Sequence, residues 1–185
     1  MWPLLIVDFE ASCLGPYSYP IEAGIARWEG PSHPVRTWSS LIRPQRRWIE
    51  HGDWTWEAQQ VHGIAPADLE GARTPHEVAS GMRMLAEGMG QALCDGGDHD
   101  LRWLTRLTLA SGWPYLPFGL SDFNSRTMEF EPDAFKRMVA HLETTAVPHR
   151  AGPDAVRLMQ ACIVGLTGVP ATLHVLVDRD ILPDS

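Results

Sequence analysis

The stretch "LLIVDFEASCLG" (residues 4–15) places two carboxylates, Asp8 and Glu10, at the end of a continuous apolar run. Such a run is typical of a strand that a layered sheet buries on both faces. Side chains two residues apart in a strand point to the same side, so both carboxylates would be directed to one place. The spacing alone favours a simpler interpretation, in which the strand ends at Val7 and water solvates both acids.

The composition describes one ordinary globular domain, which we expect to span residues 1–185. Of the 185 residues, 44% are hydrophobic and 21% are charged, which suits a chain with a single core. No stretch approaches the roughly 18 consecutive apolar residues of a membrane span, and the N-terminus lacks the features of a secretory signal. We therefore expect no membrane partner.

Three distant cysteines, Cys13, Cys94 and Cys162, argue against a disulfide framework or a paired-cysteine metal site. They fit a reducing, cytoplasmic location, where we expect them to be buried as small hydrophobic residues. The formal net charge of −8 argues against an electrostatic grip on long nucleic acid. If nucleic acid is the substrate, this charge favours a few nucleotides near a 3′ end over a long duplex.

The hydrophobic pattern predicts a mixed α/β fold, because strands come first and then alternate with helices. Segment 46–64 reads as short helical turns mixed with loop, and the tail "TLHVLVDRDILPDS" is ambiguous. Thr74 and Glu77 form a capping box at the start of the first long helix. The expected strands cover 3–9, 21–30, 35–44, 92–97 and the centre of 114–125, and the expected helices cover 74–93, 98–110, 132–143 and 148–166.

A second acidic group lies in "CDGGDHDLRWL" (94–104), where a short strand passes into a helix. Acids in the first turn of a helix are favoured by the helix dipole, so no further role is required for them. Of Asp95, Asp98 and Asp100, we choose Asp100 as the one directed inward. It precedes the apolar residues that would dock the helix beside the sheet, but the choice among the three stays open.

The third candidate is "HRAGPDAVRL" (149–158), in which His149 and Asp154 lie five residues apart. By chance alone such a pair is about an even bet in this chain. Pro148, Gly152 and Pro153 stiffen the start of the following apolar helix, which would anchor Asp154. The alternative is a first-turn acid that complements the helix dipole, with His149 in a surface loop.

Together these residues would make a site for divalent cations. Carboxylates without cysteine or a histidine cluster suit Mg²⁺ or Mn²⁺ better than zinc. Two such ions about 4 Å apart can activate water and stabilise the leaving oxygen of a phosphodiester. A histidine that titrates near neutrality can accept the proton from that water.

The order of these motifs resembles the DEDDh family of 3′–5′ exonucleases, which has a ribonuclease H-like fold. The similarity runs from about residue 4 to about residue 160, and it includes "YPIEAGIA", "LIRP" and "VHGIAPADLEGARTPHEV". It implies a mixed five-stranded sheet flanked by helices. The implied metal ligands are Asp8, Glu10, Asp100 and Asp154, holding two Mg²⁺ or Mn²⁺ ions, with His149 as general base.

The resemblance also implies substrate contacts. The family often has two threonines and a glycine after its first motif, where this chain has "ASCLG". Leu14 would wedge against the terminal base, Ser12 would contact sugar or phosphate, and His62 would lie near the nucleotide pocket. A His62 that merely packs beside the tryptophan-rich segment fits equally well.

The predicted function is a metal-dependent 3′–5′ exonuclease that acts on RNA or short single strands and releases nucleoside 5′-monophosphates. Its partners would be the 3′ ends of single-stranded RNA or DNA and short oligonucleotides, and the family includes homodimers. The main alternative is a catalytically inactive module that keeps the fold and binds a nucleotide or a protein. A third is a structural domain whose acids are all solvated.

Overall fold

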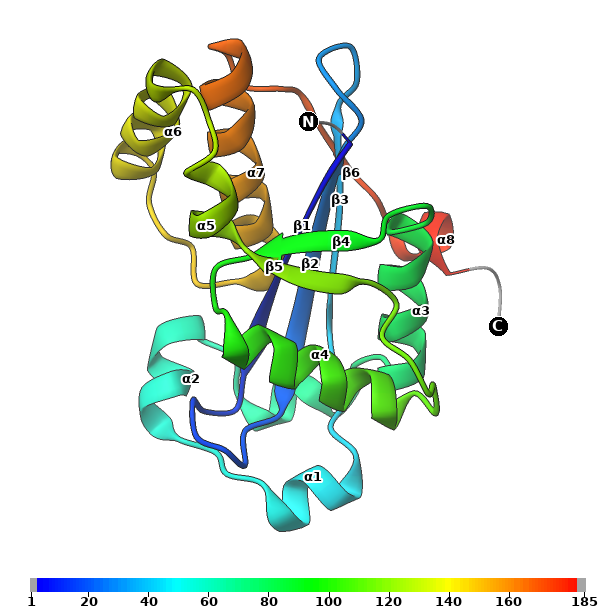
Figure 1. Ribbon diagram of the computed structural model, residues 1–185. Helices are drawn as coiled ribbons and strands as arrows, with labels where there is room; N and C mark the ends of the chain where they lie inside the picture. The colour runs from blue at the N-terminus through cyan, green and yellow to red at the C-terminus, as the bar shows by residue number, and fades with distance from the viewer. Residues whose placement is uncertain (1–2, 183–185) are drawn as a thin grey trace.

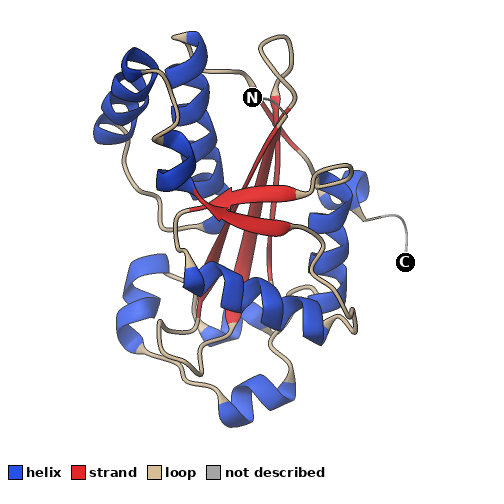
Figure 2. Ribbon diagram, viewed as in Figure 1, coloured by secondary structure: helices blue, strands red, loops and turns tan. Residues whose placement is uncertain are grey.

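The computed structural model describes residues 3–182, which build a mixed six-stranded sheet with helices on both faces (Figures 1 and 2). The strand order is β5-β4-β1-β2-β3-β6. The strands are β1 (Leu4–Ala11), β2 (Pro20–Trp28), β3 (Val35–Leu41), β4 (Gln91–Cys94), β5 (Gly119–Asp122) and β6 (Leu173–Val175). The α/β, ribonuclease H-like fold class predicted from the sequence is confirmed, with one more strand than expected.

The α-helices are α1 (Arg46–His51), α2 (Trp56–His62), α3 (Pro75–Leu85), α4 (Asp98–Ala110), α5 (Phe123–Thr127), α6 (Pro132–Thr144), α7 (Ala151–Thr167) and α8 (Asp178–Ile181). A short 3₁₀ helix, η1, covers Pro66–Leu69. Within the described residues, no helix has both the length and the apolar character needed to cross a membrane.

The pairing of the strands is mixed in direction. β1 and β2 are antiparallel, as are β2 and β3, whereas β4 runs parallel to β1 and β5 parallel to β4. The sixth strand, β6, comes from the tail and pairs in parallel with β3 at the sheet edge. All three of its residues are exposed, and three residues are too few for their apolar-polar alternation to predict a strand.

Alternation along β1 divides the core into two layers. Leu5, Val7 and Phe9 pack with buried residues of α3 and α4, whereas Ile6 packs with buried residues of α6 and α7. Figure 1 shows α6 and α7 together on one side of the sheet, with α3 and α4 on the other. Because Asp8 and Glu10 share the parity of Ile6, they continue the face that α7 covers.

β1 extends through both acids to Ala11. The interpretation that the strand ends at Val7 is therefore wrong, since the ladder with β2 pairs Asp8 with Gly24 and Glu10 with Glu22. Both carboxylates are held by a hydrogen-bonded strand and are only partly exposed.

The helix expected over 74–93 is shorter than predicted. α3 ends at Leu85, and a turn with Gly88 at φ +76° leads into β4 at Gln91. The apolar spacing continues past the helix because Met89, in the turn before β4, also packs against the core. The capping box of Thr74 and Glu77 is present as predicted.

All three cysteines are free and buried, as expected. Trp28 and Trp103 are likewise core residues.

Candidate active site

The parallel pairing of β1 with β4 brings the first two acidic segments together. Ile6 and Leu93 are partners in the ladder, and Asp8 and Asp95 each follow two residues later. Because neighbouring parallel strands end at the same edge of a sheet, both carboxylates reach one place. Asp95, which the sequence left as an alternative, is thus part of the site's geometry.

Asp100 joins them from the first turn of α4. Only 1% of its surface is exposed, and the backbone N–H of Gly96 donates a 2.9 Å hydrogen bond to its Oδ2. A Cβ at Gly96 would lie 2.7 Å from that oxygen, so glycine is needed for this close approach. Asp98 is exposed and belongs to neither acidic group.

Asp154 lies in the first turn of α7, and this turn packs directly against the sheet. A Cβ at Gly24 of β2 would overlap the carbonyl of Ala151, and one at Gly152 would lie 2.6 Å from Ser39 Oγ on β3. Glycine on both sides therefore allows the helix start to touch the strands. Asp154 Oδ2 accepts a 2.9 Å hydrogen bond from the backbone N–H of Arg150, which fixes the carboxylate at this end.

Glu22, a residue that the sequence analysis did not select, anchors the same helix start. It is 3% exposed, and its carboxylate accepts hydrogen bonds from Arg150 Nε at 2.9 Å and Arg150 Nη2 at 2.6 Å. The backbone N–H of Ala151 donates a further bond of 3.0 Å. A glutamate inside the apolar run "PIEAGIARW" was the available signal, because a buried carboxylate needs a partner.

The acids form two groups that share Asp8. One consists of Asp8, Glu10 and Asp154, and the other of Asp8, Asp95 and Asp100; in each, one oxygen per residue lies within 4.8 Å of the others. Oxygen donors at this separation suit hard divalent cations.

Burial and mutual repulsion raise the pKa of four carboxylates of the site, those of Asp8, Glu10, Asp95 and Asp100. Burial, with the negative charges of Asp100 and Glu10, raises the pKa of Asp8 well above its ordinary value. Burial, with Glu22 and Asp154, raises the pKa of Glu10 to about 8. Burial also raises the pKa of Asp100 to about 7 and increases that of Asp95. Such perturbed groups gathered at one edge of a sheet mark a candidate functional site.

His149 occupies the loop that precedes α7. It is exposed and has a φ of +54°, a left-handed conformation that non-glycine residues seldom adopt. Its ring makes no hydrogen bond with a described residue, so it is free to meet a ligand. Its role as a base stays a prediction.

The three predicted substrate contacts differ in accessibility. Leu14 is 68% exposed in the loop after β1, as a wedge requires. Ser12 is fully buried, and its Oγ accepts a 3.1 Å hydrogen bond from the N–H of Tyr19. His62 is also buried beside Trp54; its Nδ1 accepts from Ile64 N–H, and its Nε2 has no hydrogen-bond partner among the described residues. Their contact with substrate stays a prediction.

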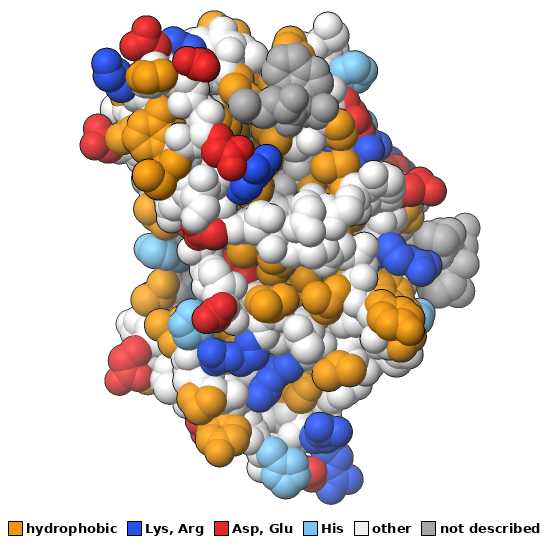
Figure 3. Space-filling view, viewed as in Figure 1, with side chains coloured by type: hydrophobic (Ala, Val, Ile, Leu, Met, Phe, Trp, Pro, Cys, Tyr) orange, Lys and Arg blue, Asp and Glu red, His pale blue; other side chains and the backbone are white. Residues whose placement is uncertain are grey.

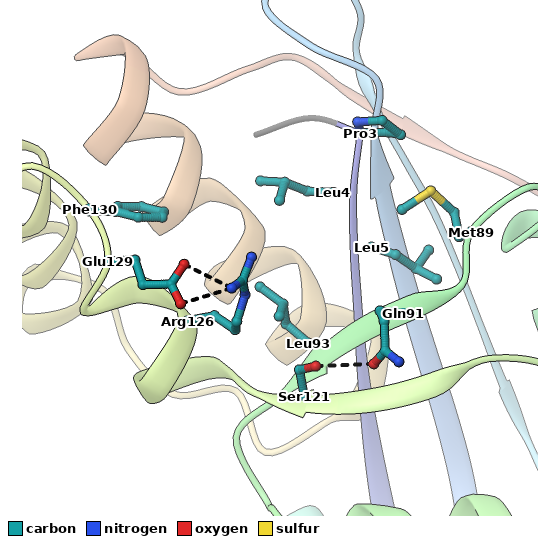
Figure 4. A pocket seen from close by; sticks show the side chains of 10 residues that line it. All are labelled: Pro3, Leu4, Leu5, Met89, Gln91, Leu93, Ser121, Arg126, Glu129 and Phe130. Atoms are coloured by element: carbon teal, nitrogen blue, oxygen red, sulfur yellow. Dashed lines mark hydrogen bonds and ion pairs between the residues drawn. The ribbon is translucent and has the colours of Figure 1, made fainter.

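A hollow of about 380 Å³ lies at the opposite end of β1 (Figure 4). Leu4, Leu5 and Phe130 line it, and Arg126 and Glu129 form an ion pair at its side. It is separate from the acidic groups, which follow the other end of the same strand.

The mixed sheet covered by helices, with carboxylates converging from β1, α4 and α7, has the ribonuclease H-like fold of solved exonuclease structures. No known family profile matches the sequence, and no curated protein matches it.

Solved structures do match. One is a 3′-exonuclease whose structure describes the 3′-end-specific recognition of a histone mRNA stem-loop. Its TM-score is 0.66, with 16% identity over 91% of this chain and 65% of that one. Another is E. coli exonuclease I in complex with a dA16 oligonucleotide, with a TM-score of 0.63 and 13% identity over 91% of this chain and 42% of that one. A third, cell-death related nuclease 4, has a TM-score of 0.57 and 16% identity over 91% and 65% of the two chains. This chain thus spans less than two thirds of the length of each.

Proposed function

We propose that this protein is a metal-dependent 3′–5′ exonuclease that acts on RNA or short single-stranded nucleic acid and releases nucleoside 5′-monophosphates. The observation that carries the proposal is the convergence of Asp8, Glu10, Asp100 and Asp154 from distant segments, with Asp8 shared between two acidic groups. The fold supports it, because the solved structures that it resembles are exonucleases.

The charge balance of the site requires cations. Several carboxylates share a partly buried space, and the nearby Arg150 is already engaged by Glu22. Burying that many negative charges together is costly unless positive charge compensates them. Mg²⁺ or Mn²⁺ fits the all-oxygen donor set. Asp8, Glu10 and Asp154 would hold one ion, and Asp8 and Asp100, with Asp95 beside them, would hold the second.

Bound ions would supply a water of lowered pKa and stabilise negative charge on a phosphodiester. The chain's own residues would do the rest. His149, exposed before α7, would accept the proton of the attacking water. Leu14, exposed on the loop after β1, would contact the terminal base and set the position of the 3′ end.

The same comparison supports a substrate class. One similar structure concerns 3′-end-specific recognition of a histone mRNA stem-loop, and another is a complex with a dA16 oligonucleotide. We infer a single-stranded 3′ end for this chain too, and its net charge of −8 favours short strands because long-range attraction to nucleic acid is weak.

Hydrolysis of 5′-labelled RNA and DNA oligonucleotides with Mg²⁺, with Mn²⁺ and with chelator tests the proposal. Wild type should shorten them stepwise from the 3′ end in a cation-dependent manner, with nucleoside 5′-monophosphates as products. Asp8→Asn should abolish this, whereas Asp98→Asn should not, because Asp98 is exposed and outside both acidic groups. Shortening that persists in chelator, or in Asp8→Asn, would refute the mechanism. Uptake of Mn²⁺ without any hydrolysis would favour the binding module instead.

A further inference from the structure

Three arginine side chains lie along α1 and α4, beside the loop that follows β1. We define the arginine face as Arg47, Arg102 and Arg106 together with the neighbouring side chains of His51 and Tyr17. Figure 3 shows Lys and Arg side chains gathered over α4 and at α1. In a chain with a net charge of −8, such a concentration of cations is a local exception.

Carboxylates do not neutralise the arginines of this face. Arg47 makes no ion pair or hydrogen bond with a described residue, whereas its neighbour Arg46 pairs with Glu50. Arg102 and Arg106 donate only to backbone carbonyls, those of Gly15, Pro16 and Tyr17. Positive charge is therefore left for a ligand.

Most arginines outside this face form ion pairs with carboxylates. Arg27 pairs with Glu29, and Arg73 pairs with Asp178. Asp53 is a carboxylate close to the loop after β1, because its N–H donates to Tyr17 O and its Oδ2 would lie 3.9 Å from a Cβ at Gly15. Among the described residues it forms no ion pair with an arginine of the face, so the excess of positive charge remains.

Four residues of the face, Tyr17, Arg47, His51 and Arg106, line a hollow of about 410 Å³. None of the described residues that line it is acidic, and Arg47 and Arg106 come from different helices. Tyr17, 60% exposed, forms part of the wall. Two guanidinium groups beside an exposed aromatic ring form a combination that suits phosphates and a stacked base.

The arginine face lies near the acidic site along α4, with Arg102 and Arg106 on the other side of the helix from the buried Asp100. Arg102 and Arg106 lie two and six residues after Asp100 on α4, which is about 3 and 9 Å along the helix axis. Arg102 Nη1 also donates a 3.0 Å hydrogen bond to Gly15 O, next to the exposed Leu14. A strand whose 3′ end lies at Leu14 and the acids would thus meet the arginines as it leaves.

We propose that the arginine face binds phosphates of the single-stranded nucleic acid upstream of its 3′-terminal nucleotide. The inference rests on the proposed function, because it assumes that the 3′ end occupies the acidic site. Its basis is charge complementarity, with uncompensated guanidinium groups facing a chain of phosphates. The face then sets how substrate length affects affinity, while the acidic site acts on the last nucleotide.

Fluorescence anisotropy with a labelled ten-nucleotide single-stranded RNA tests the face without any turnover. The full chain is titrated in chelator over a range of salt concentrations. Arg47→Gln should weaken binding about tenfold at low salt, as expected for one lost charge-assisted contact. It should also reduce the slope of log K against log salt by about 0.7, the value for one phosphate contact on a single strand.

Lys136→Gln is the matched control, since it removes the same charge from an exposed position on α6 whose only ion pair with a described residue is with Asp133. It should leave both affinity and slope unchanged. Equal effects of the two substitutions, or no binding by wild type, would refute nucleic-acid binding by the arginine face.

Hydrolysis of a dinucleotide, which is too short to reach the face, tests the acidic site separately. Arg47→Gln should leave that rate unchanged while lowering kcat/KM for the ten-nucleotide RNA.

Discussion

Asp8 and Gly24 face each other across the β1–β2 ladder, and Gly24 is the point where the first turn of α7 rests on the sheet. The missing side chain on β2 lets the backbone of Ala151 touch the strand. Asp154, one turn along α7, consequently reaches the carboxylate of Asp8. The acidic site thus depends on a residue with no functional group.

Gly24→Ala should damage both stability and the site. The added Cβ would overlap backbone atoms of Ala151 and Gly152, which cannot rotate away. We expect a loss of roughly 3 kcal/mol of unfolding free energy and a large loss of cation-dependent hydrolysis. Thermal unfolding and the oligonucleotide assay measure the two effects.

Gly71→Ala is the control for Gly24→Ala. A Cβ at Gly71 meets nothing within 4 Å, so this variant should match wild type. Wild-type stability of Gly24→Ala would contradict the packing of α7 described above.

The three acidic motifs were readable from the sequence because each adjoins an apolar segment: the first follows that of β1, and the others precede those of α4 and α7. The pattern of β1 fixes the side of Asp8 and Glu10, and those of α4 and α7 fix Asp100 and Asp154. Asp95 and Asp100 could not be separated, because both reach the site and only the β1–β4 register shows it.

Other features depend on contacts that a local pattern does not contain. Glu22 binds Arg150 across 128 residues of sequence, and Gly24 matters only because Ala151 lies on it. The sequence showed that Glu22 and Gly24 are unusual residues for an apolar strand, but it did not show which residues they contact. The edge strand β6 has only three residues, all exposed, so its apolar-polar alternation is too short to predict the pairing with β3.

Glu22→Gln should lower stability and also make Glu10 easier to ionise. Gln keeps an oxygen for Ala151 N–H but loses the charge that holds Arg150, at a cost of about 2 kcal/mol. Because Glu22 lies opposite Glu10 and helps to raise its pKa, that pKa should fall from about 8. Thermal unfolding in chelator and NMR titration of the Glu10 carboxyl measure these changes.

Glu29→Gln is the comparison for Glu22→Gln. Glu29 also pairs with arginine, but it is more exposed, so we expect a loss of less than about 1 kcal/mol. An unchanged Glu10 titration in Glu22→Gln would show that the two carboxylates are not coupled.

The metal-free protein should lose stability as pH rises. Glu10 has a pKa of about 8 and Asp100 one of about 7, both above their ordinary values. Between about pH 4.5 and 8 the folded protein therefore holds protons that the unfolded chain has released, so the free energy of unfolding falls with pH. In chelator, the melting temperature should be lower at pH 8 than at pH 5.

Mn²⁺ should reverse this trend, because cation binding needs ionised carboxylates and releases their protons. Affinity for Mn²⁺ should rise with pH up to about 8, which calorimetry in buffers of different ionisation enthalpy can follow. Glu10→Gln should flatten the pH dependence in chelator. A melting temperature in chelator that is the same at pH 5 and pH 8 for wild type would contradict these pKa shifts.

His149→Asn should separate catalysis from folding and from cation binding. Asparagine tolerates the left-handed backbone at φ +54° but cannot accept a proton near neutral pH. We expect a fall in kcat of about 10²- to 10⁴-fold, the usual contribution of a general base. Mn²⁺ affinity and melting temperature should stay unchanged, because the His149 ring forms no hydrogen bond with a described residue.

His174→Asn, which changes an exposed residue of β6, serves as the control and should keep full activity. If His149→Asn hydrolyses RNA at the wild-type rate, another group accepts the proton and only the carboxylates of the proposed site remain necessary.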